Sequence, residues 1–461
     1  MLLSLPATAM GFALSVQISA LSWILTVKYH LDIHQVGLVW AAGPLAGILG
    51  QVIVGMVSDN VWFWQGRRRP FILIGGVLAA MSLLALPNIG VISMAMGGAP
   101  LLGIAVLIAL TLDLSINISF NPTRAIIADV TPEGNPRTKG YTWMQTISGS
   151  FGVLAYAVGA LYGNYALIYV GAILVLLLSI ISPLLISEPR QLAADTEQQQ
   201  VVEKNSILSV LMHIKPLWGF IIYDIYAMTL QLLAIKVEHY WVELAVAVFT
   251  LLSVAQTLLA KEPVQRQRVN HIGFRKVLAA HSFSWIGVQT MFVFIIAFLQ
   301  DKMPLVSTDQ LGKIIATSFL ILSAVSALLP AFVLEPIAKR IGRVKTHTLC
   351  LATMAIGYWL VALFGSNVKV LYALMALLGI GWSAIISLPF AIMSEQVEQS
   401  RMGLFMGLFN LSVVLPQLLV SLGVGLFISK LGDKDAVFYL CAITLAISTF
   451  AWLMVNDTKQ N

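Results

Sequence analysis

The chain has 461 residues, of which 59% are hydrophobic and only 10% are charged, and its net charge is +6 at pH 7. Soluble domains carry about 25% charged residues, so this composition excludes an ordinary soluble protein and predicts an integral membrane protein built from helices. The basic residues are scattered over short loops, so the positive balance does not indicate a nucleic-acid-binding surface.

The predicted topology rests on apolar runs whose length is close to the roughly 20 residues that a helix needs to cross a bilayer. They predict fourteen spans, near residues 5–27, 36–58, 70–88, 101–123, 141–163, 166–187, 216–235, 241–260, 277–299, 311–334, 346–364, 370–394, 402–428 and 436–456. We interpret them as two six-helix halves, 1–187 and 261–461, with a polar linker at 188–215 and an inserted two-helix hairpin at 216–260.

The basic residues orient this topology. With the N-terminus inside, most of the 27 Lys and Arg residues fall on the inner side, and so does every Arg outside the membrane. We therefore expect both termini to be cytoplasmic, in a bacterial inner membrane, and we expect a monomer. The first segment has no basic flank and no small-residue cleavage site, so we expect it to be a retained span.

The span near 101–123 carries the main candidate site, because an ionisable residue inside a membrane is costly and usually faces a bundle interior or a water-filled cavity. Helical residues turn by about 100° each, which places Asp113, Asn117, Asn121 and Arg124 on one face. This face predicts a polar stripe that is the main candidate for a functional site. Arg124 is expected either to pair with that carboxylate or to bind a substrate.

Other polar residues inside spans are candidates for lining a central cavity or, alternatively, for bridging packed helices. In span 277–299, His281, Ser284, Trp285 and Gln289 share a helical face, and we expect His281 to be an ordinary membrane-interface residue. An aromatic ring can stack on the apolar face of a substrate, and amides can bind its polar groups. The substrate candidates are Gln17, Gln51, Trp285, Gln289, Asn410 and Gln417.

Two inner loops combine acids with Gly-Arg sequences, one after the second span and one after the second span of the second half. We predict that they form a cytoplasmic gate with the acid at the end of span four. The gate residues are Asp59, Arg67, Arg68, Arg69, Asp129, Glu335, Arg340 and Arg343. This repeat resembles the signature of the major facilitator superfamily, which implies a midplane site between two six-helix halves.

The resemblance narrows to the plant sucrose/proton symporters and their bacterial and animal relatives. It is carried by Trp40 with Gly43-Pro44, by Leu112-Asp113 with Asn117, Pro122 and Arg124, and by residues 407–417. It implies proton-coupled uptake of a disaccharide such as sucrose or maltose by alternating access. In that family the acid at Asp113 carries the proton and the Arg at Arg124 is needed for transport. The hairpin at 216–260 departs from the plant proteins, and we expect it to pack outside the core; an interfacial hairpin is the alternative for this segment.

A drug/proton antiporter of the same superfamily and a non-transporting membrane sensor are the alternative functions. The sequence contains no GxSxG, HExxH or P-loop pattern, so we predict that it is not an enzyme and has no cofactor or metal. Cys350 and Cys441 lie at or within spans, and we expect them to be apolar fillers. The partners are then a sugar, a proton and the lipid bilayer.

Overall fold

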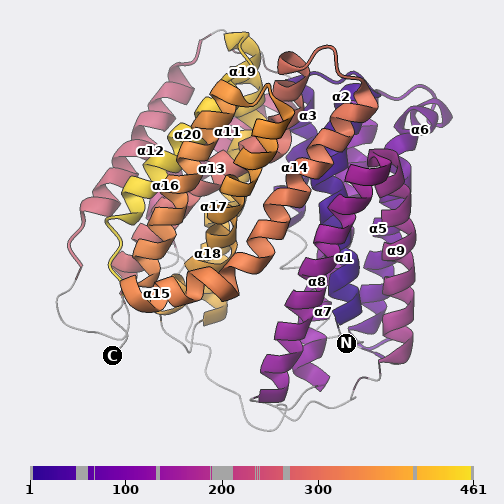
Figure 1. The fold of residues 1–461 in the computed structure, drawn as a ribbon, viewed down its shortest axis with the longest axis horizontal. Coiled ribbons are helices and arrows are strands. Elements are labelled where there is room, and N and C mark those ends of the chain that lie inside the picture. The colour runs from indigo at the N-terminus through magenta and orange to yellow at the C-terminus, as the bar shows by residue number, and fades with distance from the viewer. Residues whose placement is uncertain are drawn as a thin grey trace. The chain divides into compact units, whose positions relative to one another are not determined.

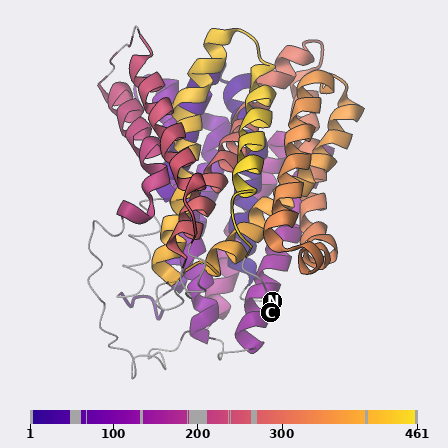
Figure 2. The same ribbon diagram turned by 90° about the vertical axis from the view of Figure 1, so that its left-hand side faces the viewer.

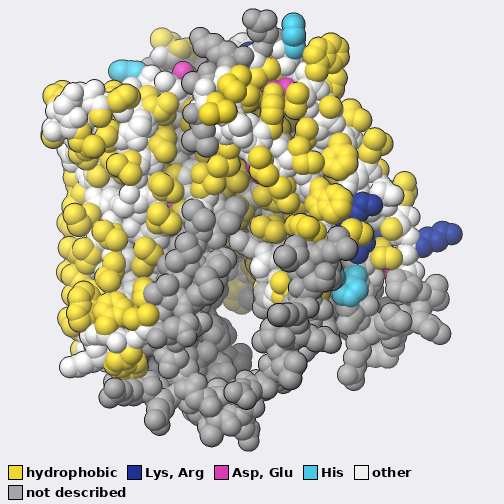
Figure 3. Space-filling model, turned by 180° about the vertical axis from the view of Figure 1, so that it is seen from behind, with side chains coloured by type: hydrophobic (Ala, Val, Ile, Leu, Met, Phe, Trp, Pro, Cys, Tyr) yellow, Lys and Arg dark blue, Asp and Glu magenta, His cyan; other side chains and the backbone are white. Residues whose placement is uncertain are grey.

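The computed structural model describes residues 4–47, 61–66, 68–130, 135–186, 188, 211–233, 235, 237, 239–262, 270–397 and 402–457. These residues are helical nearly throughout, and Figure 3 shows one face covered mainly by hydrophobic side chains with few charges. Within the described part, ten helices are long and apolar enough to cross a membrane, and two shorter apolar helices span Thr146–Tyr162 and Ala436–Trp452. The prediction of an all-helical membrane protein is therefore confirmed.

The described chain divides into two compact units, the first drawn from Met1–Glu203 and Leu305–Leu320, the second from Lys204–Pro304 and Ile321–Asn461. The α-helices of the first unit are labelled in Figure 1. The elements of this unit are α1 (Leu5–Val16), the π-helix η2 (Gln17–Leu21), α2 (Ser22–Val27), α3 (Ile33–Trp40), α5 (Arg69–Ala85), α6 (Ile89–Ala95), α7 (Leu101–Val130), α8 (Asn135–Tyr162), α9 (Asn164–Leu185) and the first part of α14 (Thr308–Leu329).

Small residues let the helices of the first unit approach closely. Gly75 on α5 lies against the backbone of α7 at Ser115 and Ser119, while the adjacent Gly76 faces Ser179 on α9. Helix α5 is therefore held between α7 and α9, and this packing fixes the position of α7, which carries Asp113.

The second unit begins with the helical pair α11 (Trp218–Leu232) and α12 (Trp241–Leu259), which run side by side in Figure 2. Its central helix is α13 (His271–Lys302), which is buried along most of its length. The remaining elements are the end of α14, η6 (Pro330–Leu334), α15 (Glu335–Ile341), α16 (Arg343–Phe364), α17 (Val368–Ser394), α18 (Met402–Leu419), the π-helix η8 (Val420–Val424), α19 (Gly425–Leu431) and α20 (Ala436–Trp452).

Helix α20 packs most closely on α13, because Gly287 on α13 admits the side chains of Leu445 and Thr444. The Ser284 and Ser448 hydroxyls are 2.7 Å apart across this contact. Cys350 and Cys441 are buried and free, as predicted.

Candidate functional site

Helix α7 holds Asp113 inside the first unit, where only 7% of the residue is exposed. The Gln17 side-chain Nε2 donates a hydrogen bond to Asp113 Oδ2 at 2.9 Å. Gln17 is itself 4% exposed and is the first residue of the π-helical turn η2. Single π-helical turns recur at functional sites, and here the turn presents an amide to a buried acid.

The backbone of the second span also approaches this acid. A Cβ added to Gly43 would lie 3.3 Å from Asp113 Oδ2, so the glycine leaves room for the carboxylate. Asn117, one turn further along α7, donates from Nδ2 to the backbone carbonyl of Asp113 at 2.8 Å and not to its carboxylate. The partner of the acid is thus a neutral amide, and protonation of Asp113 would remove the cost of burying its charge.

The continuous helix α7 contains all four residues of the predicted polar stripe. The side chains of Asn121, Arg124 and Asp129 lie outside the described residues, as do the whole of Gln51, Asp59 and Arg67. The predicted pairing of Arg124 with Asp113 therefore stays a prediction.

Three polar residues of the first span, Ser19, Ser22 and Trp23, make hydrogen bonds to other segments. Ser19 and Asn164 exchange hydrogen bonds of 3.2 and 3.3 Å, and the Trp40 indole donates to the Ser22 hydroxyl at 2.8 Å. The Trp23 indole donates to the backbone carbonyl of Thr308 at 2.9 Å. These bonds hold the end of the first span in place, whereas Gln17 is the residue of that span that contacts the acid.

A second polar cluster lies inside the second unit, on α13 and α18. Gln417 Nε2 donates to Gln289 Oε1 at 3.2 Å, and both amides keep further hydrogen-bonding capacity. Asn410 is half-buried about two turns before Gln417 on α18. Of the predicted amide candidates of the second half, the structure therefore brings Gln289 and Gln417 together as a hydrogen-bonded pair. Asn410 lies on the same helix as Gln417.

Aromatic rings surround the half-buried Trp285 in this cluster. Its indole donates to His281 Nε2 at 2.9 Å, and its ring meets Trp382 of α17 edge to face at a centroid distance of 5.8 Å. His281 stacks on Phe409 at 4.9 Å and is only 1% exposed, so the expectation of a membrane-interface histidine was wrong. Trp382 was missed in the sequence because a single tryptophan within an apolar span does not by itself indicate a site.

The basic loop of the first unit is anchored by Glu188, which follows α9. The backbone N–H groups of Arg68 and Arg69 donate to its two carboxylate oxygens at 2.9 and 2.6 Å, and the Arg69 guanidinium also contacts the carbonyl of Pro183. A carboxylate at a helix N-terminus satisfies orphan N–H groups and complements the helix dipole. Glu188 thus caps α5.

The second unit repeats this arrangement at α16. Asp457, which follows α20, accepts the backbone N–H of Val344 at 3.2 Å, and Arg343 forms an ion pair with Glu395 at the end of α17. Burial raises the pKa of Asp457, while the Val344 hydrogen bond lowers it. In each unit an acid after the last helix caps the third span. The sequence analysis did not identify Glu188, Glu395 or Asp457, because the Gly-Arg motif contains only the residues of the loop.

The remaining predicted gate residues lie on the surface of the second unit. Glu335 pairs with Lys339 at 2.8 Å across one helical turn, and Arg340 is exposed. Among the described residues, no group of three or more His, Cys, Asp or Glu side chains could hold a metal ion.

Two family models cover nearly all of the chain. Residues 2–261 match the family of MFS/sugar transport proteins, and residues 277–461 match the Major Facilitator Superfamily. The chain belongs to the major facilitator superfamily. The resemblance to this superfamily that we inferred from the two Gly-Arg loops is therefore confirmed.

Curated relatives include sucrose transport proteins. The chain is 35% identical over 136 residues to sucrose transport protein SUC4 of Arabidopsis thaliana, which covers 28% of this chain and 26% of that protein. A general alpha-glucoside permease of Schizosaccharomyces pombe is 33% identical over 27% of this chain and 23% of its own length. The chain thus aligns with about a quarter of the length of these two relatives. Sucrose transport protein SUT3 of Oryza sativa subsp. indica is 22% identical over 89% of this chain and 83% of that protein.

Solved structures share the fold. A D-xylose-proton symporter superposes with a TM-score of 0.65 at 14% identity over 99% of this chain and 97% of that chain. The nucleoside transporter NupG gives a TM-score of 0.64 at 13% identity over 98% of both chains. These superpositions establish a common architecture. The sequence identities are too low to carry information on the substrate.

Proposed function

We propose that the protein is a proton-coupled sugar symporter that transports a disaccharide or related glycoside of the sucrose or maltose type by alternating access. The main support is the buried Asp113, bonded to Gln17 at 2.9 Å, in a chain whose relatives include sucrose transport proteins and an alpha-glucoside permease. The proposal includes fourteen spans, arranged as two six-helix halves with the hairpin at 216–260 between them in the sequence. The protein would lie in a bacterial inner membrane, with both termini on the cytoplasmic side.

In this mechanism Asp113 takes a proton from one side of the membrane and gives it up on the other. When protonated it can stay buried while access changes, because no charge is then held away from water. When ionised it needs water or a counter-charge, and Arg124 is the proposed partner. Gln17 is a positioning residue that holds the carboxyl oxygen in either state, since its amide can donate to both forms.

The second unit supplies groups suited to a sugar. The Gln289 and Gln417 amides would bind hydroxyls, and the half-buried Trp285 ring would stack on the C–H face of a pyranose. This division gives one unit the proton chemistry and the other the sugar recognition. The repeated capping of α5 by Glu188 and α16 by Asp457 would hold the inner loops as a cytoplasmic gate.

A panel of radiolabelled sugars in proteoliposomes tests this proposal. We expect sucrose or maltose to accumulate against its gradient when the outside is made acidic, and to equilibrate only when the pH gradient is collapsed. Accumulation of amphipathic cations driven by the opposite gradient would indicate a drug/proton antiporter. Binding of sugar without any flux would indicate a sensor.

A further inference from the structure

The inserted hairpin α11–α12 encloses a large pocket against the rest of the second unit. Its volume is about 760 Å³, in the range of sites for small organic ligands. The walls come from α11, α12, α13, η8, α19 and α20, and are almost entirely apolar. The sugar proposal does not use this pocket, because its polar groups are few and its charged residues, Glu243 and Lys430, are too few to bind the many hydroxyls of a sugar.

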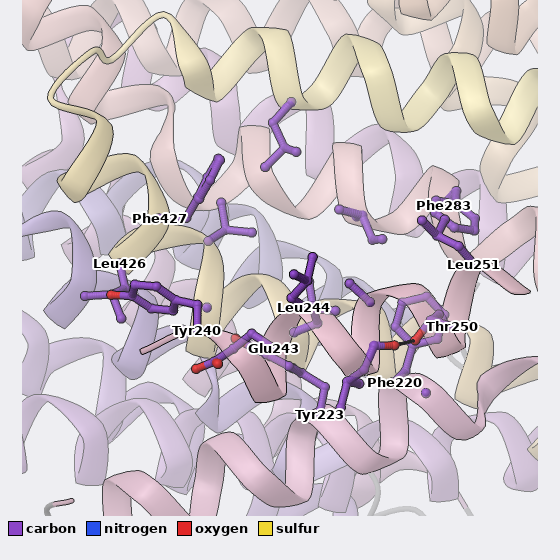
Figure 4. A pocket seen from close by; sticks show the side chains of 18 of the residues that line it. Phe220, Tyr223, Tyr240, Glu243, Leu244, Thr250, Leu251, Phe283, Leu426 and Phe427 are labelled. Carbon is purple, nitrogen blue, oxygen red and sulfur yellow. Dashed lines mark hydrogen bonds between the residues drawn. The ribbon is translucent and has the colours of Figure 1, made fainter. Parts of the chain in front are cut away.

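Figure 4 shows Tyr240 and Glu243 at one end of the pocket and Phe220, Thr250 and Phe283 at the other. From Tyr240 to Leu251 the lining runs along α12 for about 16 Å, at 1.5 Å per residue. Half of the roughly 30 Å hydrocarbon core is about 15 Å. The pocket therefore has the length of one leaflet.

The rim of the pocket opens to the surface of the helices. Leu244 is 55% exposed and Leu251 51% exposed, although both belong to the lining. In a membrane these side chains meet lipid tails, so an acyl chain can enter sideways. Trp241, 74% exposed beside Tyr240, marks the polar end as the membrane interface, where Trp and Tyr gather.

The polar end presents both signs of charge. The Lys430 ammonium lies 4.2 Å from the centroid of the Tyr240 ring, and Lys430 is an exposed residue. Glu243 Oε1 accepts the Tyr226 hydroxyl at 3.2 Å, whereas the buried Oε2 has no hydrogen-bond partner among the described residues. A buried carboxylate oxygen requires a donor, and none of the lining residues supplies one.

We propose that this pocket binds one zwitterionic aminophospholipid, with an acyl chain between the hairpin and α13, its phosphate at Lys430 and its ammonium at Glu243 Oε2. A primary ammonium has N–H donors for the orphan oxygen, whereas the quaternary nitrogen of a choline headgroup has none. Under the proposed topology the lipid belongs to the outer leaflet. It would attach the hairpin to the transporter core.

The test compares lipids bound to the full-length protein. The protein is purified from nanodiscs of equimolar palmitoyl-oleoyl phosphatidylethanolamine, phosphatidylcholine and phosphatidylglycerol, and retained lipid is counted by native mass spectrometry. We expect one phosphatidylethanolamine per chain, preferred at least about tenfold over phosphatidylcholine, as one charge-assisted hydrogen bond implies. Glu243→Gln should abolish the preference for the primary ammonium.

A matched pair of variants separates the pocket from general lipid contact. Ala247 lines the pocket and Ala245, on the same helix, is exposed but does not. Ala247→Trp should lose the retained lipid, while Ala245→Trp should keep it. Equal retention by these two variants, or equal retention of the three lipids by the unmodified protein, would overturn the proposal. If Ala247→Trp fails to fold, the preference of the unmodified protein for phosphatidylethanolamine, and the loss of that preference in Glu243→Gln, still test the proposal.

Discussion

The contact between α5 and α7 gives a sharp test of how the first unit positions Asp113. Replacing Gly75 by Ala adds a Cβ that would lie 2.6 Å from the Ser115 carbonyl oxygen and 2.7 Å from the Ser119 nitrogen. Both atoms belong to the backbone of α7, so no side-chain rotation can relieve the overlap. Ser115 is two residues from Asp113, and any displacement of α7 there moves the acid relative to Gln17.

The size of the effect follows from the geometry. Ordinary contacts begin near 3.4 Å, so the helices must separate by about 0.8 Å. Overpacking of this kind costs about 1–3 kcal/mol. Gly103→Ala on α7 is the matched control, because its Cβ meets nothing within 4 Å. Replacing a helical glycine by alanine stabilises the folded state by about 0.5–1 kcal/mol in both variants. The difference between their free energies of unfolding therefore measures the cost of the overlap.

Thermal unfolding of the two purified variants measures this difference. At about 2–4 °C per kcal/mol, Gly75→Ala should melt roughly 2–12 °C below Gly103→Ala. Proton-driven uptake should fall in Gly75→Ala and remain unchanged in Gly103→Ala. Equal melting temperatures in the two variants would refute the close packing of α5 on α7.

Three further substitutions test separate contacts. Gln17→Leu removes a hydrogen bond worth about 1.5–3 kcal/mol to the ionised carboxylate and about 0.5–1.5 kcal/mol to the protonated acid, so the pH at which uptake falls to half should shift upward by about one unit; an unchanged pH profile would contradict the role of Gln17 beside Asp113. Gln289→Leu should raise the KM for sugar at least about tenfold, because it removes one of the two amides proposed to bind sugar hydroxyls and leaves a hydroxyl without a partner, and a lower kcat at constant KM would argue against sugar binding there. Glu188→Gln should lower the free energy of unfolding by about 1 kcal/mol through loss of a charged helix cap, which chemical denaturation in detergent would detect.

The sequence was sufficient for the features that depend on one helix. The apolar runs located the ten described helices that are long and apolar enough to cross a membrane, and they located α7, which is continuous from Leu101 to Val130. The common face of the four polar residues on α7 stays a prediction. The repeated Gly-Arg loop was sufficient for the superfamily. These features are local, so periodicity and motif spacing capture them.

The features that were missed are contacts between distant segments. Gln17 and Asp113 are 96 residues apart, and a π-helical turn, which no simple periodicity predicts, presents the amide. His281 was placed at the interface by its position in the span, but its ring is buried on Phe409 and bonded to Trp285. Glu188 looked like part of a polar linker, and only the fold brings it to the N-terminus of α5.

The most direct test of the central claim compares uphill uptake with sugar exchange in Asp113→Asn. Asparagine keeps the size of the side chain and resembles the protonated acid, but it cannot release a proton. We predict that the variant in proteoliposomes exchanges internal for external radiolabelled sugar and no longer accumulates sugar when the outside is acidic. Full proton-driven accumulation by Asp113→Asn would contradict the assignment of Asp113 as the coupling residue.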